Sequence, residues 1–331
     1  MRKCFLHIGT HKTGTTAIQL QLKKHARELE KWRFLYPRAG VPRRLAGHHN
    51  ISWQLRGDRR FKPEYGTLDD LFLEIGKSDK NIILSSEDFQ CAADVLGSFI
   101  SRLERHGCSV EVIVYFRDQL SYCRSLYLEL ITLGYDQTFS DFLLEILEHR
   151  RVRWQDSVFS FDYQALLNQL PPTTTITARA FRRQNSVIGD FLSILGLTPS
   201  DVKIDPDFRF NMQGPISVAV AQLDHNRTGR NIRKNYKAIM RSLSSAFDGR
   251  EIDLSEHSRQ KLVAALEASN RWMVDRFGIT MPADPIEPRS CQSAGVNLEE
   301  VFSAATLRLI DTQCASVSRG KWSVFGWSAR R

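Results

Sequence analysis

Residues 9–16 read Gly9-Thr10-His11-Lys12-Thr13-Gly14-Thr15-Thr16, and they directly follow a short apolar run at residues 4–8. A strand that runs into a glycine-containing turn and then a helix builds a phosphate-binding loop from backbone N–H groups and a helix N-terminus. The GxxxxG spacing is that of the nucleotide-hydrolase P-loop, but Thr15 stands where that loop needs a lysine. The lysine of this loop, Lys12, comes two residues before Gly14. The stretch therefore predicts a phosphate site and argues against a kinase or NTPase.

The composition is that of a soluble globular protein with a basic surplus. The chain has 331 residues, 42% hydrophobic and 25% charged, so it can bury a substantial core as one large domain or two smaller ones. Its formal net charge of +9 favours anionic ligands, which include acidic polysaccharide, nucleic acid and a negative membrane surface. Charge alone does not choose among them.

The sequence favours a cytoplasmic protein without a metal site. The apolar run at residues 4–8 is too short for a secretory signal, and no later stretch reaches the ~18 apolar residues of a membrane span. The six cysteines show no CxxC pair or other metal-ligand spacing, which is typical of reduced thiols. We therefore expect no bound metal.

Three further apolar runs, at residues 81–85, 110–116 and 174–178, are bounded by polar residues and predict buried parallel strands. Helical periodicity fills the gaps between them. Strands that alternate with helices predict an α/β fold with a central parallel β-sheet flanked by helices, whose ligands bind at the edge where the strands end. The helices are expected after the phosphate loop (with Ile18, Leu22, Ala26 and Leu29 on one face) and at 98–105, 120–133, 139–150 and 187–195.

The domain organisation is less regular outside this core. Residues 36–66 are rich in Pro, Gly, Arg and His, which indicates a long insertion over the sheet edge that faces the substrate. From about residue 205 the pattern is helical, most clearly at 262–277. We expect a main domain over residues 1–282 and a C-terminal extension over 283–331 with no clear order.

A second anion site is predicted at the end of the third strand. Arg117 follows the apolar run 110–116, and Ser125 lies eight residues later on the next helix. If the turn folds back, a guanidinium and a hydroxyl converge on one phosphate. The alternative for Arg117 is a solvated or salt-bridged arginine. The alternative for the loop at residues 9–16 is a helix N-terminus that is capped by a threonine.

These residues resemble the sulfotransferases that use 3′-phosphoadenosine 5′-phosphosulfate (PAPS). Residues 6–16 are similar to that family's 5′-phosphosulfate loop, written PKTGTT or PKSGTTW. Arg117 and Ser125 match the spacing of its 3′-phosphate pair, with Tyr127 also in place. The similarity is greatest to the bacterial branch that acts on carbohydrates.

The chain departs from the family pattern at several positions. His11 replaces a common proline, Ala17 replaces the tryptophan of aryl enzymes, and Asp118-Gln119 replaces a common Asn-Pro. The family's C-terminal glycine-rich phosphate loop has no clear equivalent; residues 318–322 resemble it only faintly.

The resemblance implies a P-loop NTPase-like sulfotransferase fold and transfer of a sulfuryl group from PAPS to a hydroxyl of a carbohydrate or glycolipid, without a metal and with 3′,5′-ADP as product. Lys12 would act in catalysis, on the bridging oxygen of the leaving group. Arg117 and Ser125 would select the 3′-phosphate. The implied donor-binding residues are Gly9, His11, Lys12, Thr13, Gly14, Thr15, Thr16, Arg117 and Ser125.

Two residues are candidates for the general base that takes the acceptor's proton. Glu87 follows the strand 81–85 on the ligand edge, and relatives that modify glycans use a glutamate in this part of the fold. Its alternative role is to cap the next helix. His49 is the second candidate, because a histidine base has a suitable pKa, although a histidine in a loop is more often a bystander.

The last candidate is a basic stripe. Basic residues recur there at three- and four-residue spacing: Arg227, Arg230, Arg233, Lys234, Lys237 and Arg241. On one helix they would grip an anionic glycan or make a peripheral contact with a membrane bearing a glycolipid; a solvated helix face is the alternative. Two other functions stay open: a nucleotide-dependent kinase with an atypical P-loop, and a basic polyanion-binding protein. We expect no nucleic-acid partner.

Overall fold

The computed structural model describes residues 1–182, 185–209, 215–229, 236–247, 252–281, 296–303, 306–308 and 310. The chain forms two compact units, the first made of residues 1–126, 145–212 and 259–288 and the second of 127–144, 213–258 and 289–331. Every residue predicted for the donor and base sites belongs to the first unit. A main domain that ends at 282 stays a prediction, because residues 282–295 and 311–331 lie outside the described part of the chain.

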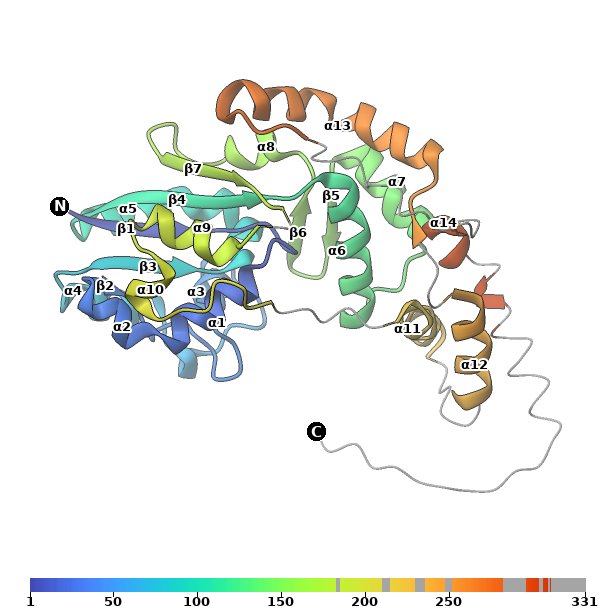
Figure 1. Cartoon of the computed structure of the whole chain (residues 1–331), viewed down its shortest axis with the longest axis horizontal. Coiled ribbons are helices and arrows are strands. Elements are labelled where there is room, and N and C mark those ends of the chain that lie inside the picture. The colour runs from blue at the N-terminus through green and yellow to red at the C-terminus, as the bar shows by residue number, and fades with distance from the viewer. Residues whose placement is uncertain are drawn as a thin grey trace. The chain divides into compact units, whose positions relative to one another are not determined.

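The first unit is built on a five-stranded, all-parallel sheet with β1 at its centre (Figure 1). In the register, His7 at the end of β1 pairs with Ser85 of β3 and with Ile113 of β4. The α/β fold with a central parallel sheet flanked by helices is thereby confirmed. The strand order is β2 (Phe34–Leu35), β3 (Asn81–Ser85), β1 (Arg2–His7), β4 (Cys108–Phe116), β7 (Thr175–Ala180).

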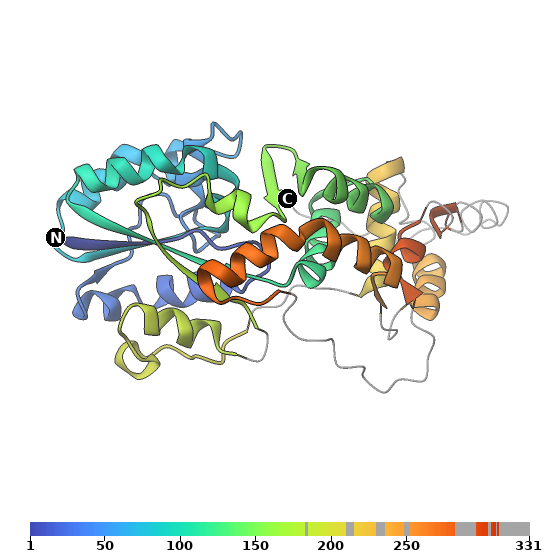
Figure 2. The same ribbon diagram turned by 90° about the horizontal axis from the view of Figure 1, so that it is seen from above.

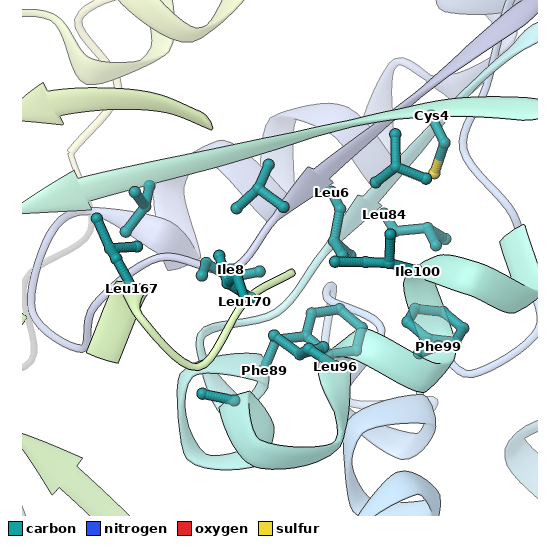
Figure 3. Packing of buried hydrophobic residues seen from close by; sticks show 14 of the residues in the cluster. Cys4, Leu6, Ile8, Leu84, Phe89, Leu96, Phe99, Ile100, Leu167 and Leu170 are labelled. Atoms are coloured by element: carbon teal, nitrogen blue, oxygen red, sulfur yellow. The ribbon is translucent and has the colours of Figure 1, made fainter. Parts of the chain in front are cut away.

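Helices cover both faces of the sheet, because successive strand residues point to opposite sides. Leu6 packs into one core and Phe5 into the other. In Figure 3, Leu6 and Leu84 of the sheet face Phe89 and Ile100, and burying each such side chain contributes about 1.5–3 kcal/mol. Figure 2 shows the layers from above. The first face carries α4 (Leu68–Gly76), α5 (Ala93–Arg105), α8 (Tyr163–Leu167) and part of α13 (Glu256–Phe277); the second carries α1 (Thr15–Lys24), α2 (Ala26–Lys31), α9 (Val187–Ile194) and α10 (Pro199–Val202).

Residues 36–66 differ from the loop that the sequence predicted. They lie between β2 and β3 and contain the helix α3 (His49–Leu55) and a 3₁₀ turn, η1 (Pro63–Tyr65). The stretch 46–53 is buried throughout. The helix α3 was not predicted, because it is short and some of its buried side chains are polar. Its sequence therefore lacks the apolar periodicity that predicts a helix.

Several further elements lie in the chain between β3 and β7. The predicted helix 120–133 is confirmed as α6 (Gln119–Leu133), which begins in the first unit and ends in the second, whereas α7 begins in the second unit and ends in the first. A two-stranded antiparallel hairpin after α7 was not predicted. These elements are η2 (Glu87–Ala92), α7 (Phe139–His149), β5 (Arg151–Trp154) and β6 (Ser157–Ser160).

The second unit contains α11 (Ile216–Thr228), α12 (Tyr236–Phe247), β8 (Ile252–Asp253), β9 (Val296–Asn297) and α14 (Leu298–Val301). The prediction of a basic stripe on one helix is wrong, because α11 is closed by Gly229 in a left-handed conformation (φ 65°). Arg227 lies on α11 and donates to the carbonyl of Asp136 (2.9 Å). Lys237 and Arg241 lie on α12, while Arg230, Arg233 and Lys234 are outside the described residues.

Two global expectations can be checked on the described residues. Cys4, Cys91, Cys108 and Cys123 are unbridged thiols; Cys291 and Cys314 lie outside the described part. Within that part, none of the helices combines the length and the apolar character that a membrane span requires.

Candidate active site

The phosphate loop has a backbone that side chains would disrupt. Gly9 and Gly14 have φ angles of +29° and +78°. A Cβ added at Gly9 would lie 2.6 Å from Thr15 Cγ2, and one at Gly14 would lie 2.9 Å from Val187 Cγ1. Lys12 also has a positive φ, at 66°. Both glycines are therefore required by the loop's shape, which brings its backbone close to α1 at Gly9 and to α9 at Gly14.

The helix after the loop is not capped by a threonine. Gly14 is the N-cap residue of α1, and no side chain makes a capping hydrogen bond there. The alternative that this stretch is only a threonine-capped helix start is therefore wrong. The helix instead presents its partial positive charge and N-terminal N–H groups at the loop, as an anion site requires.

Side-chain hydrogen bonds hold the loop in place. The Thr10 hydroxyl donates to the carbonyl of Tyr115 (2.8 Å), and the Thr13 hydroxyl donates to the carbonyl of Thr10 (2.5 Å). Arg117 Nη1 donates to the carbonyl of Lys12 (3.0 Å). The structure thus joins the loop after β1 to the end of β4. Thr10 was missed as a site residue, because its spacing to Tyr115 is set only by the pairing of β1 with β4.

Arg117 is only 7% exposed, so the alternative of a solvated arginine is wrong. Its backbone carbonyl accepts a hydrogen bond from the Tyr163 hydroxyl (2.6 Å), and its guanidinium carbon lies 5.9 Å from the ring centre of Phe181. Ser125 lies on α6 and is 2% exposed. The structure brings Arg117 to the phosphate loop; the shared 3′-phosphate site of Arg117 and Ser125 stays a prediction.

Glu87 lies beside the phosphate loop's helix. It follows β3, and its Oε2 accepts a hydrogen bond from Gln19 Nε2 of α1 (2.7 Å). The cap of η2 is Ser86, whose hydroxyl accepts from the Asp88 N–H, so the predicted alternative of Glu87 as a cap is wrong. Burial by itself would raise the pKa of Glu87, but the nearby His49 and His11 hold it below its usual range.

His49 is brought to the same place from α3. Its Nδ1 lies 3.0 Å from Asp88 Oδ2 and 2.9 Å from the Ser86 hydroxyl, and its ring stacks on Trp53 with centroids 5.9 Å apart. Burial would lower the pKa of His49, but the charges of Glu87 and Asp88 outweigh it and raise the pKa above its ordinary value. The two candidate bases therefore interact.

Two other histidines near this edge are structural. His48 Nδ1 accepts from the Ser85 N–H (3.1 Å), so its Nε2 donates to the carbonyl of Pro37 (3.0 Å). Burial lowers the pKa of His48 to about 4. His7 Nδ1 lies 2.8 Å from the Ser85 hydroxyl, and burial also lowers the pKa of His7 to about 4. Both rings are neutral near pH 7.

The carboxylate of Asp88, which the sequence did not single out, organises the surroundings of His49. Trp53 Nε1 donates to its Oδ2 (3.0 Å), while Arg56 and Arg60 approach its Oδ1 at 3.3 and 3.5 Å. The same two arginines bind Asp58 at 2.6 and 2.7 Å. Burial by itself would raise the pKa of Asp88, but the hydrogen bond and charge of His49, with the charges of His11 and Arg60, hold it far below its usual range. Only the R-x-D-x-R spacing of residues 56–60 hinted at such a cluster.

One group of potential metal ligands occurs among the described residues: atoms of His11, Asp88 and Cys91 lie within 4.8 Å of one another. Both Asp88 oxygens already accept hydrogen bonds from Trp53 and arginine side chains, so this carboxylate is committed to the protein's own contacts. The ring of His11 packs edge-on against Phe159 of β6, 4.9 Å between centroids. We assign no metal to this group.

Comparisons with known proteins add little to this site. No family model matches the chain, and no curated protein is significantly similar to it. A solved structure described as "Molecular and structural characterization of the PezAT chromosomal toxin-antitoxin system of the human pathogen Streptococcus pneumoniae" is 11% identical, covering 80% of this chain and 88% of its own, with a TM-score of 0.28. A likeness this distant carries no argument.

Proposed function

We propose that this chain is a PAPS-dependent sulfotransferase that transfers a sulfuryl group to a hydroxyl of a carbohydrate or glycolipid. The observation that carries the proposal is the contact between Arg117 Nη1 and the carbonyl of Lys12. It joins a glycine-bounded phosphate loop to the strand-end arginine that the sequence pairs with a second phosphate. A ligand with phosphates at two positions suits this arrangement better than one with a single phosphate.

The reaction requires two functions that residues of the site could supply: stabilisation of the leaving group's charge and removal of the hydroxyl proton. The acceptor's oxygen attacks sulfur, the bond from sulfur to the 5′-phosphate oxygen breaks, and its electron pair stays on the leaving 3′,5′-ADP. Lys12 and the N-terminus of α1 would stabilise that developing negative charge. Glu87 or His49 would take the hydroxyl proton.

The carbohydrate acceptor rests on the resemblance to the bacterial branch. A peripheral membrane contact through the basic residues loses support, because Arg227 and Lys237 lie on different helices. The polyanion-binding alternative is weakened for the same reason. A kinase would need a lysine after Gly14, where Thr15 begins α1, and a carboxylate available to magnesium, whereas Asp88 is bound by Trp53 and two arginines.

The test is calorimetric titration of the full chain with 3′,5′-ADP, with 5′-AMP, and with ATP plus Mg²⁺. The proposal expects 3′,5′-ADP to bind at least ten times more tightly than 5′-AMP in the presence of EDTA, because a charge-assisted arginine–phosphate contact contributes about 1.5–3 kcal/mol. Equal affinities, or a preference for Mg-ATP, would overturn it and favour the kinase.

A further inference from the structure

The hairpin formed by β5 and β6 lies against the candidate site. Phe159 of β6 packs on the ring of His11 in the phosphate loop, with 4.9 Å between the centroids, and β6 also contacts η2. At the hairpin's turn, Arg56 Nη1 donates to the carbonyl of Asp156 (2.9 Å) and to the hydroxyl of Ser157 (3.4 Å). Figure 1 shows the hairpin near the end of the sheet where its strands stop. The hairpin is therefore held beside the phosphate loop both at its turn and along β6.

Trp154 lies on the face of the hairpin that makes these contacts. In the antiparallel pair, Trp154 is the cross-strand partner of Ser157, and Val152 is that of Phe159. Residues directly opposite each other lie on the same face of a sheet, and so do alternate residues of one strand. Trp154 therefore shares its face with Ser157 and Phe159. Arg153, on the other face, is exposed.

The indole of Trp154 differs from the other described indoles in its contacts. Trp32 and Trp53 donate their N–H to oxygens of other residues, and the ring of Trp272 packs against Phe277. Trp154 is only partly buried, and it makes no ring contact, cation–π contact or side-chain hydrogen bond with any residue that the structure describes. Tryptophan combines a large apolar ring with one polar N–H group. Both are available to a ligand here, beside the phosphate loop.

The surroundings of this indole suit a sugar better than an aromatic molecule. A pyranose ring has a face of C–H groups that can stack on one aromatic ring, and its hydroxyls need polar partners at the edge of that ring. Polar groups lie next to Trp154, because Ser157 accepts hydrogen bonds from Arg56 and Arg60, and the Arg60 side chain is 42% exposed. An aryl acceptor would need an apolar slot that covers both of its faces.

We propose that Trp154 is an acceptor-binding residue, whose indole stacks on a sugar ring while the exposed end of Arg60 binds hydroxyls of the same sugar. The hairpin would then hold an oligosaccharide on the face by which Phe159 contacts the phosphate loop. That this oligosaccharide is the acceptor of sulfuryl transfer rests on the proposed function. That a sugar binds at Trp154 does not.

The first experiment measures sugar binding and does not need activity. The full chain is applied to an array of immobilised neutral and acidic oligosaccharides, as the wild type and as variants. We expect the wild type to bind a defined set of them, Trp154→Ala to bind that set about tenfold more weakly, and Trp154→Phe, which keeps an aromatic face, to retain most of the affinity. Trp32→Ala is the control, because it removes another exposed tryptophan, at the end of α2, and should bind as the wild type does.

A second variant separates stacking from folding. If Trp154→Ala fails to fold, Trp154→Leu keeps an apolar side chain on the hairpin and removes only the aromatic face, and it should show the same loss. The inference is overturned if the wild type binds no oligosaccharide, or if these variants bind as well as the wild type. Displacement of the bound oligosaccharide by 2-naphthol would also overturn it, because the site would then be an aryl site.

The second experiment is kinetic and uses an oligosaccharide that the wild type binds on the array. Trp154→Ala should raise the KM for this acceptor about tenfold and leave kcat and the affinity for 3′,5′-ADP unchanged, because stacking stabilises the ground state and the transition state equally. A lower kcat with an unchanged KM would contradict a role in acceptor binding. Absence of selective 3′,5′-ADP binding would reject the sulfotransferase, while the array would still decide whether a sugar binds at Trp154.

Discussion

Two neighbouring parts of the same sheet edge are built on different physical principles. The phosphate loop is shaped by backbone: two glycines with positive φ, and hydrogen bonds that end on carbonyl oxygens. The cluster around Asp88 is shaped by side chains, with buried carboxylates bound by guanidiniums, an indole and an imidazole. The two parts should therefore respond differently to mutation. Losing a side chain should affect the loop's chemistry, whereas in the cluster it should affect stability first.

The largest expected effect is on the cluster. Asp88→Ala should lower the free energy of unfolding by about 3–5 kcal/mol, because it leaves buried positive charge without its carboxylate. Asp69→Ala is the matched control, since that carboxylate binds Arg102 but is 88% exposed, and it should cost less than about 1 kcal/mol. Urea unfolding of both variants measures this, and equal losses would show that the cluster is no more costly to break than a surface pair.

Lys12→Ala should show the opposite behaviour. We expect sulfuryl transfer to slow by about 10²–10³-fold, since the lysine would stabilise charge that develops only in the transition state, with 3′,5′-ADP affinity and unfolding free energy little changed. Lys24→Ala, an exposed lysine at the end of α1, is the control. Turnover rates at saturating donor concentration measure this effect. A rate equal to that of the wild type would show that Lys12 has no catalytic role.

Arg117→Ala tests whether this residue serves the ligand or only the loop. If it binds the 3′-phosphate, affinity for 3′,5′-ADP should fall about ten- to a hundredfold while 5′-AMP binding falls far less. Arg105→Ala, on the exposed end of α5, should change neither. Equal losses for the two nucleotides would mean that Arg117 acts only through its bond to the Lys12 carbonyl.

The smallest effect should come from His7, which lies between the two parts, with Nδ1 on Ser85. Burial lowers the pKa of His7 to about 4. The free energy of unfolding is therefore largest above the unfolded pKa of about 6.5, where His7 is neutral in both states. It falls by about 1.6 kcal/mol between pH 6.5 and 5, because the unfolded chain takes up the proton first. In His7→Gln this loss should be correspondingly smaller, as measured by urea unfolding at both pH values. Exposed His149→Gln should keep the full loss, and an unaltered slope in His7→Gln would contradict the assignment.

Local sequence was sufficient for the loop and for four of the five strands of this sheet, whereas the two-residue edge strand β2 was not predicted. The strand 81–85 was predicted to the residue, because a run buried on both faces needs no partner information to be recognised. The helix after the loop was predicted as one piece, but it breaks at His25 into α1 and α2. Helix α3 was missed because its polar residues, such as His49 and Asn50, are buried by contacts with distant segments.

The candidate site likewise has features that could be predicted from the sequence and features that could not. From the sequence we predicted the loop at residues 9–16, since its glycines and its lysine are contiguous and backbone conformation depends on near neighbours. We also predicted Arg117, Glu87 and His49 as site residues, each from the residues next to it in the sequence. The folded chain was needed to show that Arg117 meets the loop at Lys12, and that His49 and Asp88, 39 residues apart, share a hydrogen bond. Burial and charge pairing, which set a side chain's protonation and partners, arise only when the chain folds.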